Sequence, residues 1–467
     1  MKCTFPGGVH PHDSKEYSRD IAIENAPIPQ TVRVPLAQHI GAPAKAVVKK
    51  GDLVKKGQKI GEPQGFVSAA VHAPVSGKVA DVGAFPHIFG RPTPCVVIEN
   101  DGKEEWAEGA LLEPQDTSAL TSKEIIDRIA AGGIVGMGGA TFPTHVKISS
   151  PKEYPIDTVI INGVECEPFL TADHRLMIEE PERVLRGAAL LQKSVNAKRL
   201  AIGVEANKPD AIKVLRDTAA KILPHAEVVE LNVKYPQGAE KQLIYAITGR
   251  EVPAPRPPKY APYFPMHVGT LVQNVGTAAA VCDAVARRIP LIERIVTVTG
   301  PGVENSKNFR ARIGTSLISL LEIAKVKPEA NKLVLGGPMM GLSQGTADIV
   351  VIKGTSGVLV LTGVKPDVSH PCIRCGKCVE ACPQRVMPQT LSILAEAERF
   401  DLMEEYDIDN CILCGSCSYV CPSKRPIVHL VEWARGVLNE MRRRKGEEEK
   451  KAQQAQKEKE AAAAAKS

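Results

Sequence analysis

The strongest constraint on the fold of this 467-residue chain is a cysteine pattern that occurs twice toward the C-terminal end. One copy reads CIRCGKCVEACP and begins at Cys372, and the other reads CILCGSCSYVCP and begins at Cys411. Both have the form C-x2-C-x2-C-x3-C-P, which is the spacing of bacterial two-cluster ferredoxins. Each copy supplies four thiols within a short stretch, so this part of the chain is expected to fold around the metal centres that the thiols bind.

The spacing also predicts which thiols share a centre. Three cysteines at two-residue gaps can hold three corners of a 4Fe–4S cube, while the fourth, three residues later on a helix, points toward the neighbouring cube. The expected ligands of the first cluster are Cys372, Cys375, Cys378 and Cys421. Those of the second cluster are Cys411, Cys414, Cys417 and Cys382. Gly376 and Gly415 let the backbone pass close to the sulfurs.

The alternative interpretation of the cysteines is a pair of structural zinc sites. Zinc usually takes two C-x-x-C pairs per site and seldom a third cysteine in series with a terminal C-P, so the doubled pattern favours iron–sulfur clusters. The segment between the two copies, which includes QTLSILAEAERFDLMEEY, has a helical pattern. We therefore expect an α-helical two-cluster ferredoxin domain, whose clusters transfer one electron at a time.

A glycine-rich string, AGGIVGMGGATFPTHVK, indicates a second kind of site. It contains Gly136, Gly138 and Gly139 and is followed by Lys147. Loops this rich in glycine let backbone N–H groups approach an anion, typically a phosphate, and a lysine adds charge. A tight packing turn is the alternative.

Acidic and amide side chains follow a predicted strand a little further along the chain. The run DTVIING leads into VECEPFLTADHR, which places Asn162, Glu165, Glu167 and Asp173 after the strand. Helical segments alternate with buried strand-like runs in this region, which predicts a parallel sheet covered by helices. Ligands bind at the carboxyl edge of such sheets, although a solvated acidic loop has the same composition.

Charge and hydropathy limit the function classes. The formal net charge is +6, but the segment from Arg442 to Lys466 carries nine Lys/Arg and five Glu, so most of the excess lies in a tail. This distribution argues against a nucleic-acid-binding body, whose basic residues would line a face. No apolar run is long enough to span a membrane, and the start of the chain lacks the pattern of a secretory signal, so a cytoplasmic protein is expected.

Several strings together resemble a known family. GMGGATFPTHVK, NGVECEPFLTADHR, YPQGAEKQL and LVQNVGT resemble the FMN- and NADH-binding subunit of respiratory complex I. The whole chain, from about residue 5 to 440, resembles the C subunit of the Rnf complex, the ion-translocating ferredoxin:NAD oxidoreductase. The arm FPGGVHP, the string PLAQHIGAPAKAVVKKGD and both cysteine motifs fit that family.

The resemblance implies a set of site residues. Those expected around FMN are Gly136, Gly138, Gly139, Phe142, Lys147, Asn162, Glu165, Asn274 and Thr277. The carboxylates implied at the reacting centre are Glu165, Glu167 and Glu240, with Glu167, Glu240 and Phe142 near the nicotinamide nucleotide. Met137, Thr141, His145 and Ala239 depart from the complex I pattern, which affects the expected position of NADH more than that of the flavin.

The resemblance and the local patterns together predict a multidomain α/β protein. We expect an extended arm over 1–30, a non-carrier barrel-sandwich domain of the biotinyl/lipoyl type over 31–117, a Rossmann-like FMN/NAD(H) domain over 118–265, a soluble-ligand-binding β-grasp domain over 266–345, connecting strands and the ferredoxin domain over 346–440, and a charged low-complexity tail over 441–467. The tail composition fits either a disordered segment or a lone solvated helix, and disorder is favoured.

The implied function is a peripheral subunit of a membrane-bound complex. The chain would pass electrons between NAD(H), FMN and two 4Fe–4S clusters at the cytoplasmic face of the cell membrane, with other subunits of the Rnf complex as partners and ferredoxin reached indirectly. One alternative is a soluble flavin and iron–sulfur reductase, such as a cobalamin reductase. Another is an electron wire that never binds NAD(H).

Overall fold

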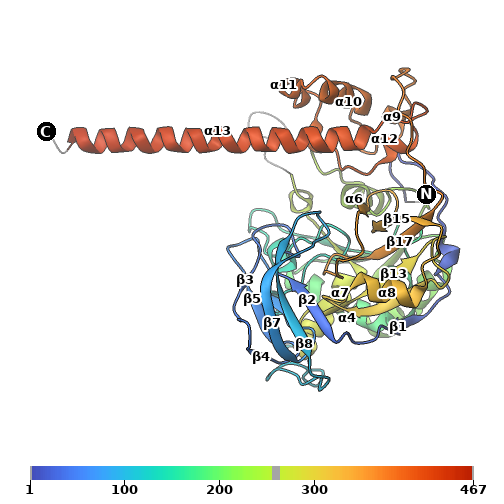
Figure 1. The fold of residues 1–467 in the computed structure, drawn as a ribbon, viewed down its shortest axis with the longest axis vertical. Helices are drawn as coiled ribbons and strands as arrows, with labels where there is room; N and C mark the ends of the chain where they lie inside the picture. Colours follow the sequence, from blue (N-terminus) through green and yellow to red (C-terminus); the bar gives the residue numbers. More distant parts are fainter. Residues whose placement is uncertain (1–2, 255–262, 465–467) are drawn as a thin grey trace. The chain divides into compact units, whose positions relative to one another are not determined.

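The computed structural model describes residues 3–254 and 263–464, and the chain forms two compact units. One unit comprises the chain as far as Phe5, His10–Val252 and Phe264–Lys365. The other comprises Pro6–Val9, the described part of Pro253–Tyr263, and the chain from Pro366 onward. The elements of both are labelled in Figure 1.

The first unit begins with a small β domain made of two antiparallel sheets. One sheet has the strand order β2-β8-β7-β4 and the other β3-β5-β6. Their bounds are β2 (Thr31–Pro35), β3 (Lys45–Ala46), β4 (Leu53–Val54), β5 (Lys59–Glu62), β6 (Val71–His72), β7 (Gly77–Phe85) and β8 (Thr93–Asn100). Short strands with tight turns were expected here, and the sequence letters between β5 and β6 offer no lysine for a carrier role.

A four-stranded parallel sheet forms the centre of the unit. Its strand order is β11-β10-β9-β12, and every pairing is parallel. The strands are β9 (Thr158–Asn162), β10 (Arg199–Glu205), β11 (Glu227–Leu231) and β12 (Thr270–Asn274). β9 and β10 are nearly continuous buried runs, as strands covered on both faces require.

Helices precede, connect and follow the strands of this sheet. They are α1 (Ser122–Ala131), α2 (Thr144–Ile148), α3 (Ala172–Glu179), α4 (Pro181–Ser194), α5 (Pro209–Ile222), α6 (Glu240–Thr248) and α7 (Val275–Arg287), with short 3₁₀ turns η1 (Lys15–Tyr17) and η2 (Pro265–Val268). Of these helices, α4, α5, α6 and α7 contact the sheet. Thr121 and Glu124 form a capping box before α1, and α4 and α5 each start with proline.

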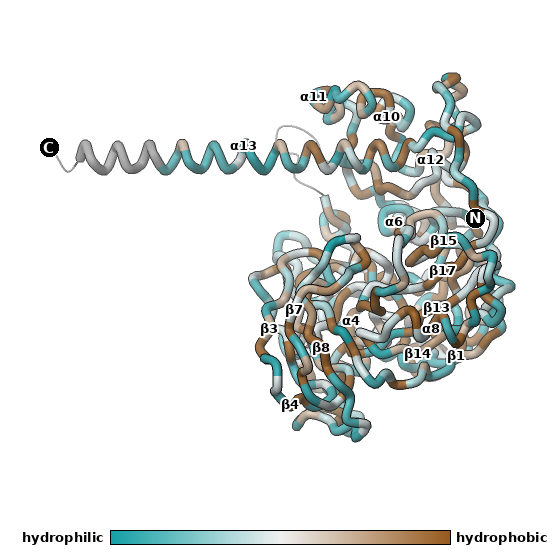
Figure 2. The backbone as a smooth tube through the Cα atoms, in the orientation of Figure 1, coloured by the Kyte–Doolittle hydropathy of each residue, from teal (hydrophilic) through white to brown (hydrophobic). Residues whose placement is uncertain are grey.

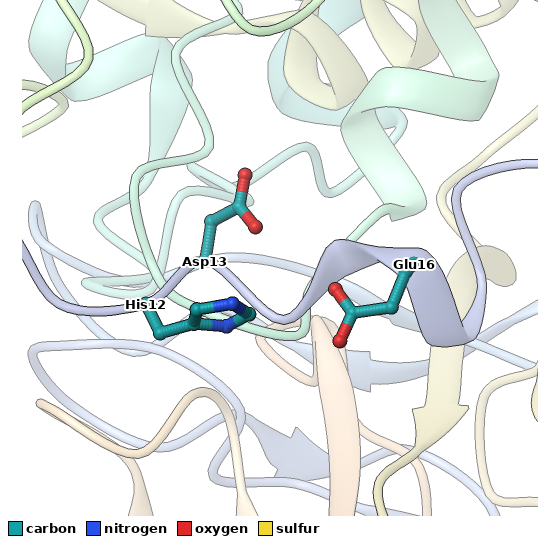
Figure 3. Close-up of side chains that lie close together, drawn as sticks. All are labelled: His12, Asp13 and Glu16. Carbon is teal, nitrogen blue, oxygen red and sulfur yellow. The ribbon is translucent and has the colours of Figure 1, made fainter.

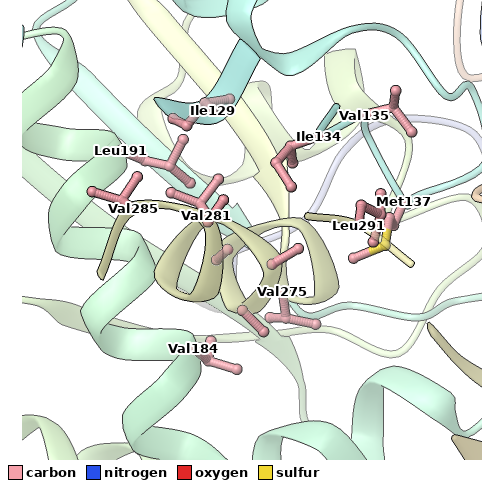
Figure 4. Close-up of a cluster of buried hydrophobic side chains, with 14 of the residues drawn as sticks. Ile129, Ile134, Val135, Met137, Val184, Leu191, Val275, Val281, Val285 and Leu291 are labelled. Atoms are coloured by element: carbon pink, nitrogen blue, oxygen red, sulfur yellow. The ribbon is translucent and has the colours of Figure 1, made fainter. Parts of the chain in front are cut away.

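Close packing of α4 against α7 consolidates the core. A Cβ at Gly187 would lie 1.7 Å from the carbonyl oxygen of Ala278, so only glycine allows this approach. Figure 4 shows side chains of α1, α4 and α7 meeting those of the glycine-rich loop, such as Ile134 and Val135. The loop is therefore anchored in the core on one side.

A six-stranded mixed sheet completes the first unit. Its strand order is β1-β14-β13-β17-β15-β16. The bounds are β1 (Ile23–Asn25), β13 (Glu293–Thr299), β14 (Lys307–Arg312), β15 (Ala330–Leu335), β16 (Leu342–Gln344) and β17 (Gly357–Thr362), and α8 (Leu317–Ala324) contacts β13.

The sheets correct two of the predicted domain boundaries. β12 pairs with β9, and α7 packs on α4, so residues just after the predicted boundary at 265/266 belong to the parallel sheet. Likewise β17 pairs with β13 and β15, so the mixed sheet extends past the predicted boundary at 345/346. Both errors arise because the strands pair with partners that are distant in the sequence.

The second unit is helical. Its elements are α9 (Lys377–Glu380), α10 (Pro388–Glu396), α11 (Phe400–Met403), η3 (Ile408–Asn410), α12 (Ser416–Tyr419) and α13 (Ile427–Ala464). Leu391, Ala395, Met403 and Val431 are buried together where α10 and α11 pack on α13. The helical pattern predicted between the cysteine motifs is present.

The C-terminal tail differs from the favoured prediction. α13 continues through the charged segment as far as Ala464, so the segment is helical rather than disordered. Figure 2 shows hydrophobic residues at the start of α13 and mainly hydrophilic ones further along. Within the described residues, no helix combines the length and the apolar character that a bilayer crossing needs.

Candidate functional site

Four cysteines of the second unit line one pocket. They are Cys382, Cys411, Cys414 and Cys417, and the unfilled space of the pocket is about 400 Å³, part of it open to solvent. Buried apolar side chains, among them Leu391, complete the wall. This set of four is the one that the spacing predicts for the second cluster, with Cys382 contributed by the other motif.

Burial raises the pKa values of Cys382, Cys411 and Cys417, which keeps these three thiols protonated when no cation is nearby. It raises the pKa of Cys382 to about 11, with smaller upward contributions from the neighbouring Cys411 and Cys414. Burial also raises the pKa of Cys417, followed by the effects of Cys411, Cys414 and Cys382. A set of thiols that hinder one another's ionisation suits a polycationic centre, which would hold all four as thiolates. The pocket thus fits an iron–sulfur cube.

The other four predicted ligands are arranged more openly. Cys378 is buried, which raises its pKa, with smaller contributions from Cys375 and Cys372. Cys375 is exposed, and Cys372 and Cys421 are half-buried. The structure thus brings the first three thiols together, whereas the assignment of Cys421 to the same cluster stays a prediction.

The two cysteine motifs follow the same backbone path. Gly376 and Gly415 both have φ of +79° and precede α9 and α12. The residue two positions earlier also has positive φ in each motif, +55° at Arg374 and +54° at Leu413. The amide of Arg374 donates to the sulfur of Cys372 at 3.4 Å, as expected for a loop that turns its N–H groups toward sulfur.

The carboxyl edge of the parallel sheet brings two predicted flavin residues together. Asn162 ends β9 and Asn274 ends β12, and the two are paired in register. Asn162 Nδ2 donates to the carbonyl of Gly238 at 2.8 Å. Asn274 Oδ1 accepts from Gly276 N at 2.8 Å at the start of α7, and its Nδ2 donates to Asp173 at 2.6 Å.

The glycine-rich loop presents free amide groups beside this edge. Gly136 N donates to the carbonyl of Phe142 at 2.8 Å, and Met137 N donates to Oγ1 of Thr277 at 2.9 Å. Gly138 and Gly139 are exposed, and among the described residues no acceptor takes their N–H groups. Two unsatisfied donors on one exposed loop fit an anionic group such as the FMN phosphate. Phe142 is half-buried in the same loop.

Lys147 lies at the same site but already has partners. Its Nζ forms a short ion pair with Glu240 and donates to the carbonyl of Val272 at 2.7 Å. The Lys147 side chain is 27% exposed, so it is accessible to a ligand. A phosphate that reached Lys147 would compete with the carboxylate of Glu240.

Glu165 serves the local fold. One carboxylate oxygen accepts from the amide of Asp173 at 2.8 Å and the other from the amide of His174 at 3.2 Å, which satisfies the start of α3. Glu165 itself has φ of +48°. Desolvation, reinforced by the adjacent Glu165 carboxylate, raises the pKa of Asp173 to about 7.

Glu167 is also engaged by the protein. It accepts from the amides of Met339 at 3.1 Å and Met340 at 2.9 Å and from the hydroxyl of Tyr235 at 3.4 Å. Burial raises its pKa, which these hydrogen bonds partly offset. In this conformation Glu167 joins the strand-end loop to the turn after β15, so a role at the nicotinamide stays a prediction.

The sequence did not predict that several lysines near these loops are buried. Lys15, from the N-terminal arm, donates to the carbonyls of Leu170 at 2.5 Å and Glu167 at 3.1 Å. Lys208 contacts Glu205 at 3.4 Å and the carbonyl of Val164 at 2.8 Å. An isolated lysine in a sequence carries no sign of burial, so no pattern could have identified them.

One group of potential metal ligands lies on the arm. His12, Asp13 and Glu16 bring ligand atoms within 4.8 Å of one another (Figure 3). His12 Nδ1 is hydrogen-bonded to Ser14, and Asp13 accepts from the amide nitrogen of Asn207 at 3.2 Å. The proximity of these three side chains is therefore explained by the hydrogen bonds of a surface turn.

Three segments of the chain match known protein families. Residues 3–103 match the RnfC barrel sandwich hybrid domain, residues 129–283 the Nuo51 FMN-binding domain, and residues 371–424 the 4Fe-4S dicluster domain. The multidomain fold, the FMN domain and the paired 4Fe–4S clusters expected from sequence are thereby confirmed. The dicluster match also favours iron–sulfur clusters over zinc.

Three relatives align over most of the chain, and each is the C subunit of a redox complex. That of the proton-translocating ferredoxin:NAD(+) oxidoreductase complex of Clostridium ljungdahlii is 46% identical over 93% of this chain and 94% of its own length. That of the Na(+)-translocating complex of Acetobacterium woodii is 43% identical over 94% of this chain and 98% of its own. That of the ion-translocating oxidoreductase complex of Rhodobacter capsulatus is 40% identical, covering 94% and 84%.

Proposed function

The chain belongs to the family of C subunits of the Rnf-type ion-translocating ferredoxin:NAD oxidoreductase complexes, and from this premise we propose that it is the peripheral subunit that exchanges electrons with NAD(H). The observation that carries the proposal is that one chain holds both an FMN-binding domain and a two-cluster domain. Bound FMN converts the two electrons of a hydride into the single electrons that 4Fe–4S clusters carry.

The residues of the chain have distinct parts in this proposal. The amides of Gly138 and Gly139 and the ammonium of Lys147 bind the FMN phosphate. Asn162 and Asn274, side by side at the sheet edge, orient the flavin. The eight cysteines of the two motifs hold the clusters, and the cluster electrons pass to other subunits of the complex and indirectly to ferredoxin.

The proposed location is the cytoplasmic face of the cell membrane, where the chain docks on membrane-embedded partner subunits. Support for this location comes from the relatives, which are named as subunits of ion-translocating complexes. Cofractionation with membranes in cells that contain the partners, and release by a wash that dissociates peripheral proteins, would support it. Recovery in the unbound fraction would favour the alternative of a free flavin and iron–sulfur reductase.

The decisive experiment is anaerobic purification followed by analysis of iron, sulfide and flavin and by titration with NADH. About eight iron atoms and one FMN per chain are expected. Addition of NADH without partner proteins should bleach the flavin absorbance. A chain that contains clusters and flavin but shows no bleaching would be an electron wire that does not react with NAD(H).

A further inference from the structure

Lys353 is a buried ammonium group that has no carboxylate partner within the described residues. Only 1% of the residue is exposed. It lies in the segment between β16 and β17, and its Nζ donates to the carbonyl oxygens of Ala70 and Gly133, each at 2.7 Å. Within the part of the chain that the structure describes, its acceptors are thus neutral oxygens, which is unusual for a charge removed from water.

Three separate regions meet at this group. Ala70 precedes β6 in the N-terminal β domain, Gly133 lies near the start of the glycine-rich loop, and Lys353 belongs to the region of the six-stranded sheet. The backbone amide of Lys353 also donates to Oε1 of Gln38 at 3.0 Å. Desolvation lowers the pKa of Lys353 to about 7, so its burial is costly and calls for a compensating role.

The segment around Lys353 contacts the glycine-rich loop at two further points. A Cβ on Gly354 would lie 2.5 Å from Cγ2 of Thr141, so the side-chain methyl group of Thr141, at the end of the loop, packs against the backbone of Gly354. In the middle, Arg294 donates to the carbonyl of Lys353 at 2.5 Å and to the carbonyl of Met137 at 3.4 Å. The loop is therefore held at its beginning, middle and end.

These contacts use carbonyl groups of the loop and do not involve the amides of Gly138 and Gly139. Lys353 donates to the carbonyl of Gly133 and Arg294 to that of Met137. Gly138 and Gly139 are exposed, and among the described residues no acceptor takes their N–H groups. A loop with its carbonyls fixed by two cations can present its amides to an anion without first reorganising.

We propose that Lys353, together with Arg294, is a positioning residue for the flavin, because it fixes the carbonyl side of the glycine-rich loop so that the amides of Gly138 and Gly139 are ready for the FMN phosphate. This inference rests on the proposed function. Lys353 does not touch the flavin itself. It makes the N-terminal β domain and the six-stranded sheet structural supports of the FMN site.

The test is FMN binding to the full chain after removal of its flavin, with Lys353→Met compared with a matched control. Lys56→Met is the control because Lys56 is also a buried lysine, but its Nζ pairs with Glu104 and lies over the ring of Trp106. K353M should weaken FMN affinity at least about tenfold, or ~1.4 kcal/mol. The FMN affinity of K56M should stay within about twofold of that of the wild type, well below a tenfold change.

Amide hydrogen exchange supplies a second measurement that does not depend on activity. In K353M the amides of residues 133–141 should exchange faster than in the wild type, while those of β9 and β10 keep their protection. Because K353M could fail to fold, Arg294→Lys serves as a second variant. It keeps the charge but cannot reach both carbonyls, so it should show a smaller change in the same direction.

The outcomes separate the inference from the proposed function. Unchanged FMN affinity and unchanged loop exchange in K353M, or in R294K if K353M does not fold, would overturn the inference. So would an equal loss of affinity in K56M. A wild-type chain that does not bind FMN at all would instead overturn the proposed function, and the inference with it.

Discussion

Two regions of the molecule are built in opposite ways: the helical unit with the two cysteine motifs, called the cysteine domain, and the carboxyl edge of the parallel sheet where FMN is proposed to bind, called the flavin edge. The cysteine domain takes all its predicted ligands from two short motifs with the same backbone path, and each ligand is a side chain. The flavin edge assembles strand ends, helix starts and a loop that lie far apart in the sequence, and its most exposed donors are backbone amides. A site made of side chains can be recognised from the residue types in the sequence. A site made of backbone amides depends on the fold that positions those amides.

The largest expected effect tests the crossed assignment of the cysteines. Cys382→Ser should remove about half of the iron, because it takes a ligand from the cluster of Cys411, Cys414 and Cys417. The double variant C382S/C414S should then lose no more iron than C382S alone, while C382S/C375S should lose nearly all of it. Iron and acid-labile sulfide in anaerobically prepared protein provide the measurement.

The control for this prediction is Cys282→Ser, which alters a cysteine of the first unit outside both motifs. It should leave the iron content unchanged. If C382S/C375S lost only as much iron as C382S, each motif would hold its own cluster and the crossed arrangement would be wrong.

The next effect concerns charge at the flavin edge. Lys147→Ala should weaken FMN binding by roughly ten- to a hundredfold, since a hydrogen bond to a charged group contributes about 1.5–3 kcal/mol. The iron content should not change. Glu240→Gln, which removes the negative charge left unpaired beside the phosphate, should partly restore binding in the K147A background. FMN titration of the flavin-free chain measures both, and equal affinity in K147A and wild type would place the phosphate elsewhere.

A smaller effect is expected from Asp173, whose pKa is raised to about 7. At pH values between the pKa of an ordinary aspartate and about 7, Asp173 keeps its proton in the folded chain but has released it in the unfolded chain. The contribution of Asp173 to the free energy of unfolding is therefore present at low pH and is lost as the pH rises toward and through 7. Raising the pH from 5 to 8 should lower the free energy of unfolding by about 1–2 kcal/mol more in wild type than in Asp173→Asn.

Urea denaturation of the flavin-free chain at the two pH values would measure this difference. Glu167 and Glu205, whose pKa values are also raised by burial, are present in both proteins, so their contributions cancel. The matched control is Asp217→Asn on the exposed face of α5, which should follow the wild type. A D173N variant with the pH dependence of the wild type would contradict the assignment.

The smallest effect is expected from the helical tail. Deletion of the chain after Gly446 removes exposed charges but keeps the ion pairs of Arg442 with Glu404 at 2.6 Å and Asp409 at 2.7 Å. Pairs between exposed side chains contribute about 0–1 kcal/mol. Iron content, FMN content and melting temperature should therefore match the full chain, and loss of iron would show that the tail supports the cysteine domain.

Local signals in the sequence predicted the elements well. The string PERVLRGAALLQKS was expected to be helical, and α4 spans Pro181–Ser194. The doubled cysteine motif predicted a helical domain, and one pocket of that domain is lined by the four thiols expected for the second cluster. These features depend on neighbours within a few residues, so the sequence contains the information directly.

Pairings between distant segments could not be predicted. β12 was placed in the wrong domain because its partner β9 lies more than a hundred residues earlier. Lys353 and Arg294 gave no signal because their importance comes from the carbonyls that surround them after folding. The tail was expected to be disordered because its composition lacks a core, but composition alone does not distinguish a solvated helix from disorder.

The strand order β11-β10-β9-β12 has a consequence for synthesis of the chain. A nascent chain that has left the ribosome only as far as β11 has made Asn162 and the glycine-rich loop but not Asn274, Thr277 or Lys353. Parallel strands joined by long connections close late, because the intervening chain must be ordered first. If FMN binds at the proposed site, it can therefore load only after β12 and the segment that carries Lys353 have been made, and a translation product truncated before β12 would lack part of that site.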